Sequence, residues 1–110
     1  MANVKFFIDQ AVMRDKDAVL DGVMAQMRAL ICDRLEVAPG ACQFAALAVR
    51  SLPDQPPVNV ELHILAKPDR TPEKLRALCL LLRDQVSDAL SVKVAIRCAQ
   101  LDAASYIAIK

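Results

Sequence analysis

The side chains that most often carry chemistry are scarce in this chain and lie far apart in its sequence. Its four cysteines, Cys32, Cys42, Cys79 and Cys98, never have the C-x-x-C spacing of a zinc knuckle or a thioredoxin-type redox pair. His63 is the only histidine, so a transition-metal site would be poorly supplied with ligands. We therefore expect four free, mostly buried thiols in a reducing compartment, and neither a metal nor another cofactor.

Glycine and net charge narrow the function classes further. Gly22 and Gly40 are the only glycines, which excludes a phosphate-binding P-loop or a dinucleotide fingerprint. Fourteen basic and thirteen acidic residues leave a formal charge of +1, so neither a nucleic-acid surface nor a polybasic membrane anchor is expected. No apolar run is long enough for a membrane span. Asp9 interrupts the first apolar run too early for a signal peptide, which favours a cytoplasmic protein.

The chain is so apolar that a monomer is expected to leave apolar surface exposed to water. Its 110 residues suffice for one domain, residues 1–110, yet 55% of them are hydrophobic and the mean hydropathy is +0.30. Soluble domains are usually about 45–50% apolar, and a small domain buries only roughly 60–70% of its unfolded surface. The remaining apolar surface predicts an oligomer interface.

The elements that would position any site follow the same order twice. In residues 1–52, Val4–Asp9 predicts a strand, a helix follows with Asp15 or Asp17 as its cap, and Cys42–Arg50 predicts a second strand. Pro39 and Gly40 end that helix. Its apolar positions recur every three or four residues: Val19, Leu20, Val23, Met24, Met27, Leu30, Ile31 and Leu35. Residues 51–57, rich in proline, form the linker.

Residues 58–110 repeat the pattern more clearly. Apolar residues alternate from Val58 to Ile64, and Thr71-Pro72 provides a helix cap followed by proline in the first turn. A second alternating strand begins near Val92, and Tyr106–Ile109 could add a short terminal strand. The predicted buried stripe of the second helix is Leu75, Leu78, Cys79, Leu82, Val86, Ala89 and Leu90.

Two strand–helix–strand units predict an α/β (α+β) fold. We expect a four-stranded sheet with both helices on one face. The other face would carry Phe7, Ala45, Leu47 and Leu65, and would remain uncovered in a single chain. We expect the chain to assemble around that face.

The residues of the second half also carry a family resemblance. An alternating strand, a loop ending in Arg70-Thr-Pro and a helix rich in Glu, Arg and Leu fill residues 58–78, and the chain ends with an Asp102-Ala-Ala-Ser-Tyr106 tail. This half resembles the tautomerase superfamily, especially its 5-carboxymethyl-2-hydroxymuconate isomerase-like branch, whereas the first half matches in layout only. The resemblance implies a tautomerase-like β-α-β fold, a homotrimer, and pockets between subunits.

In that family a terminal proline supplies a neutral secondary amine that moves a proton between carbons of an enol. Here the resemblance places Ala2 at the position of the proline. An alanine amine, with an ordinary pKa of about 7.7–8.0, can still act as a base, but it is primary and less constrained. If Met1 is retained, the amine lies one residue, about 3.8 Å, from the family's position. Met1 and Ala2 are thus the implied catalytic positions of a member that lacks the catalytic proline.

In the family, arginines bind substrate carboxylates through the planar guanidinium and polarise the carbonyl, so the resemblance gives Arg70 both a catalytic and a substrate-binding role. Arg70 matches the loop arginine, with an exposed loop cation as the alternative interpretation. The arginine of the family's second strand has no counterpart, and Arg50 is either its substitute or a solvated charge at the strand end. Lys67 could help to bind an anion or could be an ordinary surface lysine.

Three functions remain open at this point. The first is an active enol–keto isomerase of the 5-carboxymethyl-2-hydroxymuconate type. The second, which we favour, is a homotrimer with weak or no tautomerase activity that binds a small carboxylate. The third is a ferredoxin-like regulatory module for a small ligand, which would be a dimer.

Overall fold

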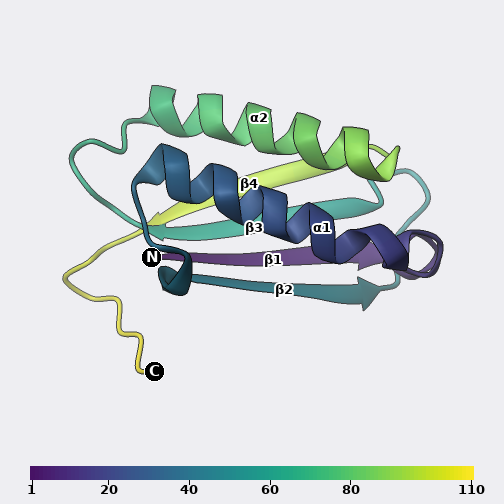
Figure 1. Cartoon of the computed structure of the whole chain (residues 1–110), viewed down its shortest axis with the longest axis horizontal. Coiled ribbons are helices and arrows are strands. Elements are labelled where there is room, and N and C mark those ends of the chain that lie inside the picture. The colour runs from purple at the N-terminus through teal and green to yellow at the C-terminus, as the bar shows by residue number, and fades with distance from the viewer.

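The computed structural model describes residues 1–110 and consists of one four-stranded sheet with two long helices packed on the same face (Figure 1). A single 3-10 turn, Pro39–Ala41, precedes the second strand. The remaining elements are β1 (Ala2–Asp9), α1 (Gln10–Leu35), β2 (Cys42–Val49), β3 (Val58–Leu65), α2 (Pro72–Leu90) and β4 (Val94–Leu101). Neither helix is long and apolar enough to span a membrane.

The two halves predicted from the sequence are confirmed as strand–helix–strand units. The strand order is β2-β1-β3-β4. β1 is parallel to β2, β3 is parallel to β4, and β1 and β3 run antiparallel at the centre. Each long helix makes the crossover that a parallel strand pair requires. The proline-rich segment from Ser51 to Pro57 connects the halves outside the regular elements.

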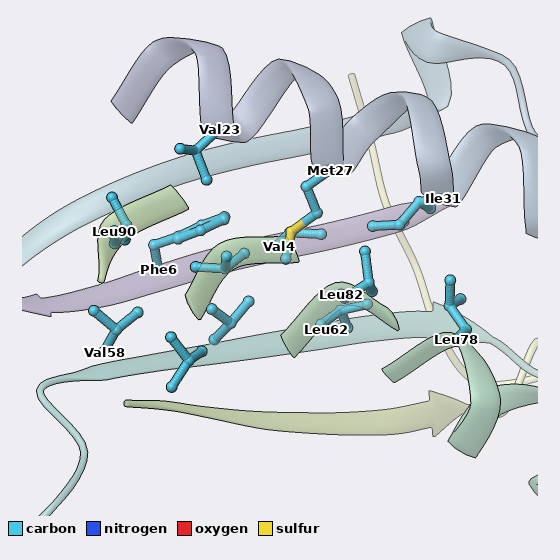
Figure 2. Packing of buried hydrophobic residues seen from close by; sticks show 14 of the residues in the cluster. Val4, Phe6, Val23, Met27, Ile31, Val58, Leu62, Leu78, Leu82 and Leu90 are labelled. Carbon is cyan, nitrogen blue, oxygen red and sulfur yellow. The ribbon is translucent and has the colours of Figure 1, made fainter. Parts of the chain in front are cut away.

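The core lies between the sheet and the helices. Every second residue of β1 and β3 is buried, as the alternation predicted, and these side chains meet the apolar stripes of α1 and α2. Figure 2 shows Met27 and Ile31 of α1 above Val4 of β1, with Leu82 of α2 over Leu62 of β3. Each such side chain contributes roughly 1.5–3 kcal/mol by leaving water. Ala89, which we expected in the stripe of α2, is exposed.

The expected start of α1 was wrong. The helix begins at Gln10, directly after β1, and its cap is Asp9 rather than Asp15 or Asp17. One carboxylate oxygen of Asp9 accepts a hydrogen bond from the Ala11 amide at 3.0 Å, and the other accepts one from the Ser51 hydroxyl at 2.6 Å. The Ser51 hydroxyl is the main reason that the pKa of Asp9 is lowered. The first turns of α1 lack a continuous apolar stripe, so periodicity could not reveal them.

The second helix is capped as predicted. Thr71 accepts a hydrogen bond from the Lys74 amide at 3.2 Å, and Pro72 is the first helical residue. Both helices end on a non-glycine residue in the left-handed conformation, Glu36 with φ 55° and Ser91 with φ 56°. Residues Tyr106–Ile109 form no strand, although the tail lies near the start of the edge strand β2.

The sheet face opposite the helices is open, as expected. In β1 and β3 this face is mostly polar, and Phe7 and Leu65 are its half-buried apolar residues. The register places Lys5 opposite Glu61, and Glu61 opposite Arg97. Leu47 on the edge strand β2 is 41% exposed. The open face therefore combines charged pairs near its centre with apolar side chains toward the β2 edge.

Candidate functional site

The strand directions bring the start of the chain, the loop after β3 and the tail after β4 to one end of the sheet. Ala2 lies opposite Cys42 on one side and Ile64 on the other, and Leu65 lies opposite Leu101. In Figure 1 the N-terminus lies near the start of β2, and the yellow tail passes below it. The amino-terminal site is defined here by residues Met1, Lys67, Arg70, Cys42 and the tail.

A small cavity of about 200 Å³ opens beside the first residue. Met1, Cys42 and Gln43 form one part of its wall, and Tyr106 and Lys110 of the tail form another. Asn3, Gly40, Ala41 and Ala108 complete the lining. The wall thus combines apolar groups with a phenol, a thiol, the terminal amine and Lys110, a composition suited to a small polar molecule.

Arg70 is the one charged residue buried in the structure. Its side chain and backbone are only 3% exposed. The loop holds it in place, because the Arg70 amide donates to the Lys67 carbonyl at 3.0 Å and Nη1 donates to the Leu65 carbonyl at 2.6 Å. The other terminal nitrogen, Nη2, is buried without a hydrogen-bond partner. No carboxylate balances this guanidinium, which is costly unless an anion binds it.

The terminal amine of Met1 has a lowered pKa, which favours its neutral form. Burial is the largest cause that lowers its pKa, and the charges of Arg70 and Lys67 lower it further because like charges disfavour a second cation. The nearby Cys42 opposes this effect in part. An amine with a lowered pKa is more often neutral near pH 7, and only the neutral amine can accept a proton.

The structure brings some of the predicted site residues together and separates one. Ala2 is the first residue of β1 and is completely buried. Arg70 is buried rather than an exposed loop cation, whereas Lys67 is exposed. Arg50 follows the end of β2, and the parallel register with β1 puts it at the opposite end of the sheet from Met1. Within one chain Arg50 therefore does not belong to the amino-terminal site.

Sequence reasoning missed Cys42 and Lys110 as neighbours of the amine. In the sequence, Cys42 resembles an ordinary core thiol, and Lys110 resembles a solvated charge at the end of the chain. The parallel pairing of β1 with β2 would have been the signal for Cys42, because it places the first residues of both strands side by side. No group of three or more His, Cys, Asp or Glu residues is placed to hold a metal ion.

Comparisons with known proteins identify the fold. No family model and no curated protein sequence matches the chain. A member of the cis-3-chloroacrylic acid dehalogenase family, N1, superposes with a TM-score of 0.75 at 13% identity, covering 96% of this chain and 79% of that one. The native fused 4-OT gives 0.71 at 14% identity, covering 96% and 91%.

Macrophage migration inhibitory factor from Toxoplasma gondii also superposes, with a TM-score of 0.71 at 10% identity, over 96% of this chain and 95% of that one. Identities this low establish common architecture rather than common chemistry. The chain therefore has the tautomerase β-α-β fold.

The buried charge of Arg70 makes a measurable prediction for the amine. Replacing Arg70 with glutamine removes one of the causes that lower the amine pKa, so that pKa should rise; Arg70→Lys keeps the charge and should change it less. The pH dependence of carbamylation of the α-amine by cyanate, followed by mass spectrometry, reports this pKa. Arg50→Gln, at the other end of the sheet, is the control and should leave it unchanged. An unchanged pKa in folded Arg70→Gln protein would contradict the arrangement.

Proposed function

We propose that this chain is a homotrimeric member of the tautomerase superfamily, related to the 5-carboxymethyl-2-hydroxymuconate isomerase-like branch, that binds a small carboxylate at the amino-terminal site and has weak or no tautomerase activity. One observation carries the binding part: the guanidinium of Arg70 is buried, held by the Leu65 carbonyl and left with an unpartnered Nη2. A carboxylate would supply both the negative charge and the hydrogen-bond acceptor that this group lacks.

The same site supports a modest proton-transfer chemistry. With a carboxylate on Arg70, a neutral terminal amine could take a proton from the enol oxygen or a neighbouring carbon and return it to another carbon. Two features weaken this reaction. The amine belongs to Met1 or Ala2 instead of a rigid proline, and Arg50 is too distant within the chain to polarise the substrate carbonyl. Poor placement of a base costs rate steeply.

The active isomerase is the second candidate, and the lowered pKa of the Met1 amine favours it. The two candidates predict different rates for the unaltered protein but the same ligand class. A regulatory module of ferredoxin-like type predicts neither the buried arginine nor the neutral amine at the same end of the sheet.

Assembly is part of the proposal. Toward its β2 edge the open sheet face carries exposed Leu47 beside half-buried Ala45 and Phe7, and this apolar area agrees with the excess of hydrophobic residues in the sequence. Two of the similar structures are described as asymmetric trimers of a fused 4-OT. A trimer would bury this face and leave the helices outside.

Binding of a 2-oxo carboxylate such as pyruvate tests the role of Arg70. We expect Arg70→Gln to weaken binding by about ten- to a hundredfold, because a hydrogen bond to a charged group is worth roughly 1.5–3 kcal/mol. Isothermal titration calorimetry measures the affinity, and thermal unfolding checks that the variant is folded. Arg50→Gln should bind like the unaltered protein. Equal affinities for all three proteins would remove Arg70 from the site.

Restoring the family's terminal residue tests the chemistry. Ala2→Pro, with Met1 removed and the terminus verified by intact mass, should accelerate ketonisation of an enol acid by at least about tenfold over the parent, since a constrained secondary amine is a better-placed base. The absorbance decay of the enol measures the rate against buffer. Fast ketonisation by the parent itself would favour the active isomerase and contradict weak activity.

The oligomeric state tests the open face. We expect the unaltered protein to be a trimer by light scattering, and Leu47→Glu to shift it toward monomer by burying a charge in the interface. Leu81→Glu is a matched control, because Leu81 on α2 is equally exposed at 41% but lies on the helix side. A dimer would favour the regulatory module instead.

A further inference from the structure

The fold gathers the four cysteines into two pairs that the sequence spacing does not suggest. Cys32 of α1 and Cys42 of β2 have sulfur atoms 3.8 Å apart. Cys79 of α2 and Cys98 of β4 line the same groove, and each thiol shifts the pKa of the other. All four thiols are free and half-buried. Each pair therefore connects a helix to the edge strand of its own half, and tertiary packing brings the two thiols together.

The surroundings of the second pair differ from those of the first. Cys79 and Cys98 line one groove of about 390 Å³ between α2 and β4, together with Arg76 and Gln100. Cys79 and Arg76 also line a neighbouring groove of about 430 Å³. No acidic residue lines either groove.

Three arginines, Arg76, Arg83 and Arg97, surround the larger groove. Arg83 is paired with Asp84 at 3.2 Å, and Arg97 contacts the side chain of Asn59, whereas Arg76 makes no ion pair. The groove is therefore electropositive and has a free guanidinium next to a thiol. Positive charge of this kind attracts anions.

The two pairs also differ in acidity. The neighbouring Cys98 thiol lowers the pKa of Cys79 to about 7, and the neighbouring Cys79 together with burial raises the pKa of Cys98. In the first pair, burial and the neighbouring Cys32 raise the pKa of Cys42 to about 11. The lowered pKa favours the thiolate of Cys79, whereas the raised pKa of Cys42 favours its neutral thiol.

We propose that Cys79 and Cys98 form a dithiol site that undergoes exchange with low-molecular-weight disulfides bearing carboxylates, of the glutathione disulfide class. Met1, Lys67 and Arg70 line neither groove, so the proposal does not rest on carboxylate binding at the amino-terminal site. Cys79 is the attacking sulfur and Cys98 the resolving sulfur, and Arg76 attracts the carboxylates of the disulfide.

The exchange balances in two steps. The Cys79 thiolate attacks one sulfur of the disulfide, the S–S bond of the disulfide breaks, and one small thiolate leaves and takes a proton from solvent. The Cys98 thiol then loses its proton and attacks the Cys79 sulfur. The mixed disulfide breaks and a second small thiol leaves. Two protein thiols are oxidised to one disulfide, and one small disulfide is reduced to two thiols.

Glutathione disulfide and the fully reduced, unaltered protein provide the direct test. Intact-mass measurement over time should show one glutathione adduct, mapped to Cys79, that gives way to a protein lighter by two hydrogens with Cys79 joined to Cys98. Cys98→Ser should stop at the mixed disulfide, and Cys79→Ser should form neither product. Cys32→Ser is the matched control and should react like the unaltered protein. Circular dichroism checks that each variant is folded.

Two further measurements, one of charge and one of acidity, distinguish the reaction at this site from nonspecific thiol oxidation. Arg76→Gln should slow the reaction with glutathione disulfide roughly fivefold, but not that with the neutral bis(2-hydroxyethyl) disulfide. Alkylation of Cys79 by iodoacetamide should be half-maximal near pH 7, and this midpoint should shift upward in Cys98→Ala, which removes the neighbouring thiol. The proposal is overturned if Cys79 reacts no faster than Cys42, or if the unaltered protein keeps the mixed disulfide without joining Cys79 to Cys98.

Discussion

The antiparallel pairing of β1 with β3 at the centre of the sheet determines where everything else in this protein lies. Because each outer strand is parallel to its inner neighbour, the start of β2 and the end of β4 must lie at the same end of the sheet as Ala2. The terminal amine, the loop that carries Arg70 and the thiol of Cys42 consequently meet there. Cys42 acts on the amine from one side, and Arg70 acts on Cys98 from the other. A different register of β1 on β3 would separate these groups.

Much of the fold could be predicted from alternation and periodicity. The strand Val58–Leu65 reads polar and apolar in turn, and Thr71-Pro72 is a cap that acts within a few residues, so both were visible locally. The start of α1 was not, because Asp9 caps a helix whose first turns bear no continuous stripe. The terminal strand predicted at Tyr106–Ile109 does not form. A strand must pair with the edge of another strand, and the sequence does not reveal whether such an edge is available.

The site was harder to predict, for a physical reason. Burial of Arg70 arises from the way that the loop folds back so that its guanidinium reaches the Leu65 carbonyl, and a sequence gives no sign of that approach. The placement of Arg50 at the far end follows from strand direction, which the sequence pattern leaves open. The cysteines illustrate the same limit. Spacing rules detect thiols that are close along the chain, whereas Cys79 and Cys98 meet only through packing of α2 on β4.

The residues that end the two helices in the left-handed conformation affect the balance between backbone strain and the entropy lost on folding. Glycine is the usual residue in that conformation, yet Glu36 and Ser91 occupy it here, at a cost of roughly 1–2 kcal/mol each. The chain has only two glycines and six prolines. Its unfolded form is therefore stiffer than that of a glycine-rich chain of equal length and loses less backbone entropy on folding. The chain thus has local backbone strain at two helix ends, but it loses less backbone entropy on folding than a glycine-rich chain of equal length would.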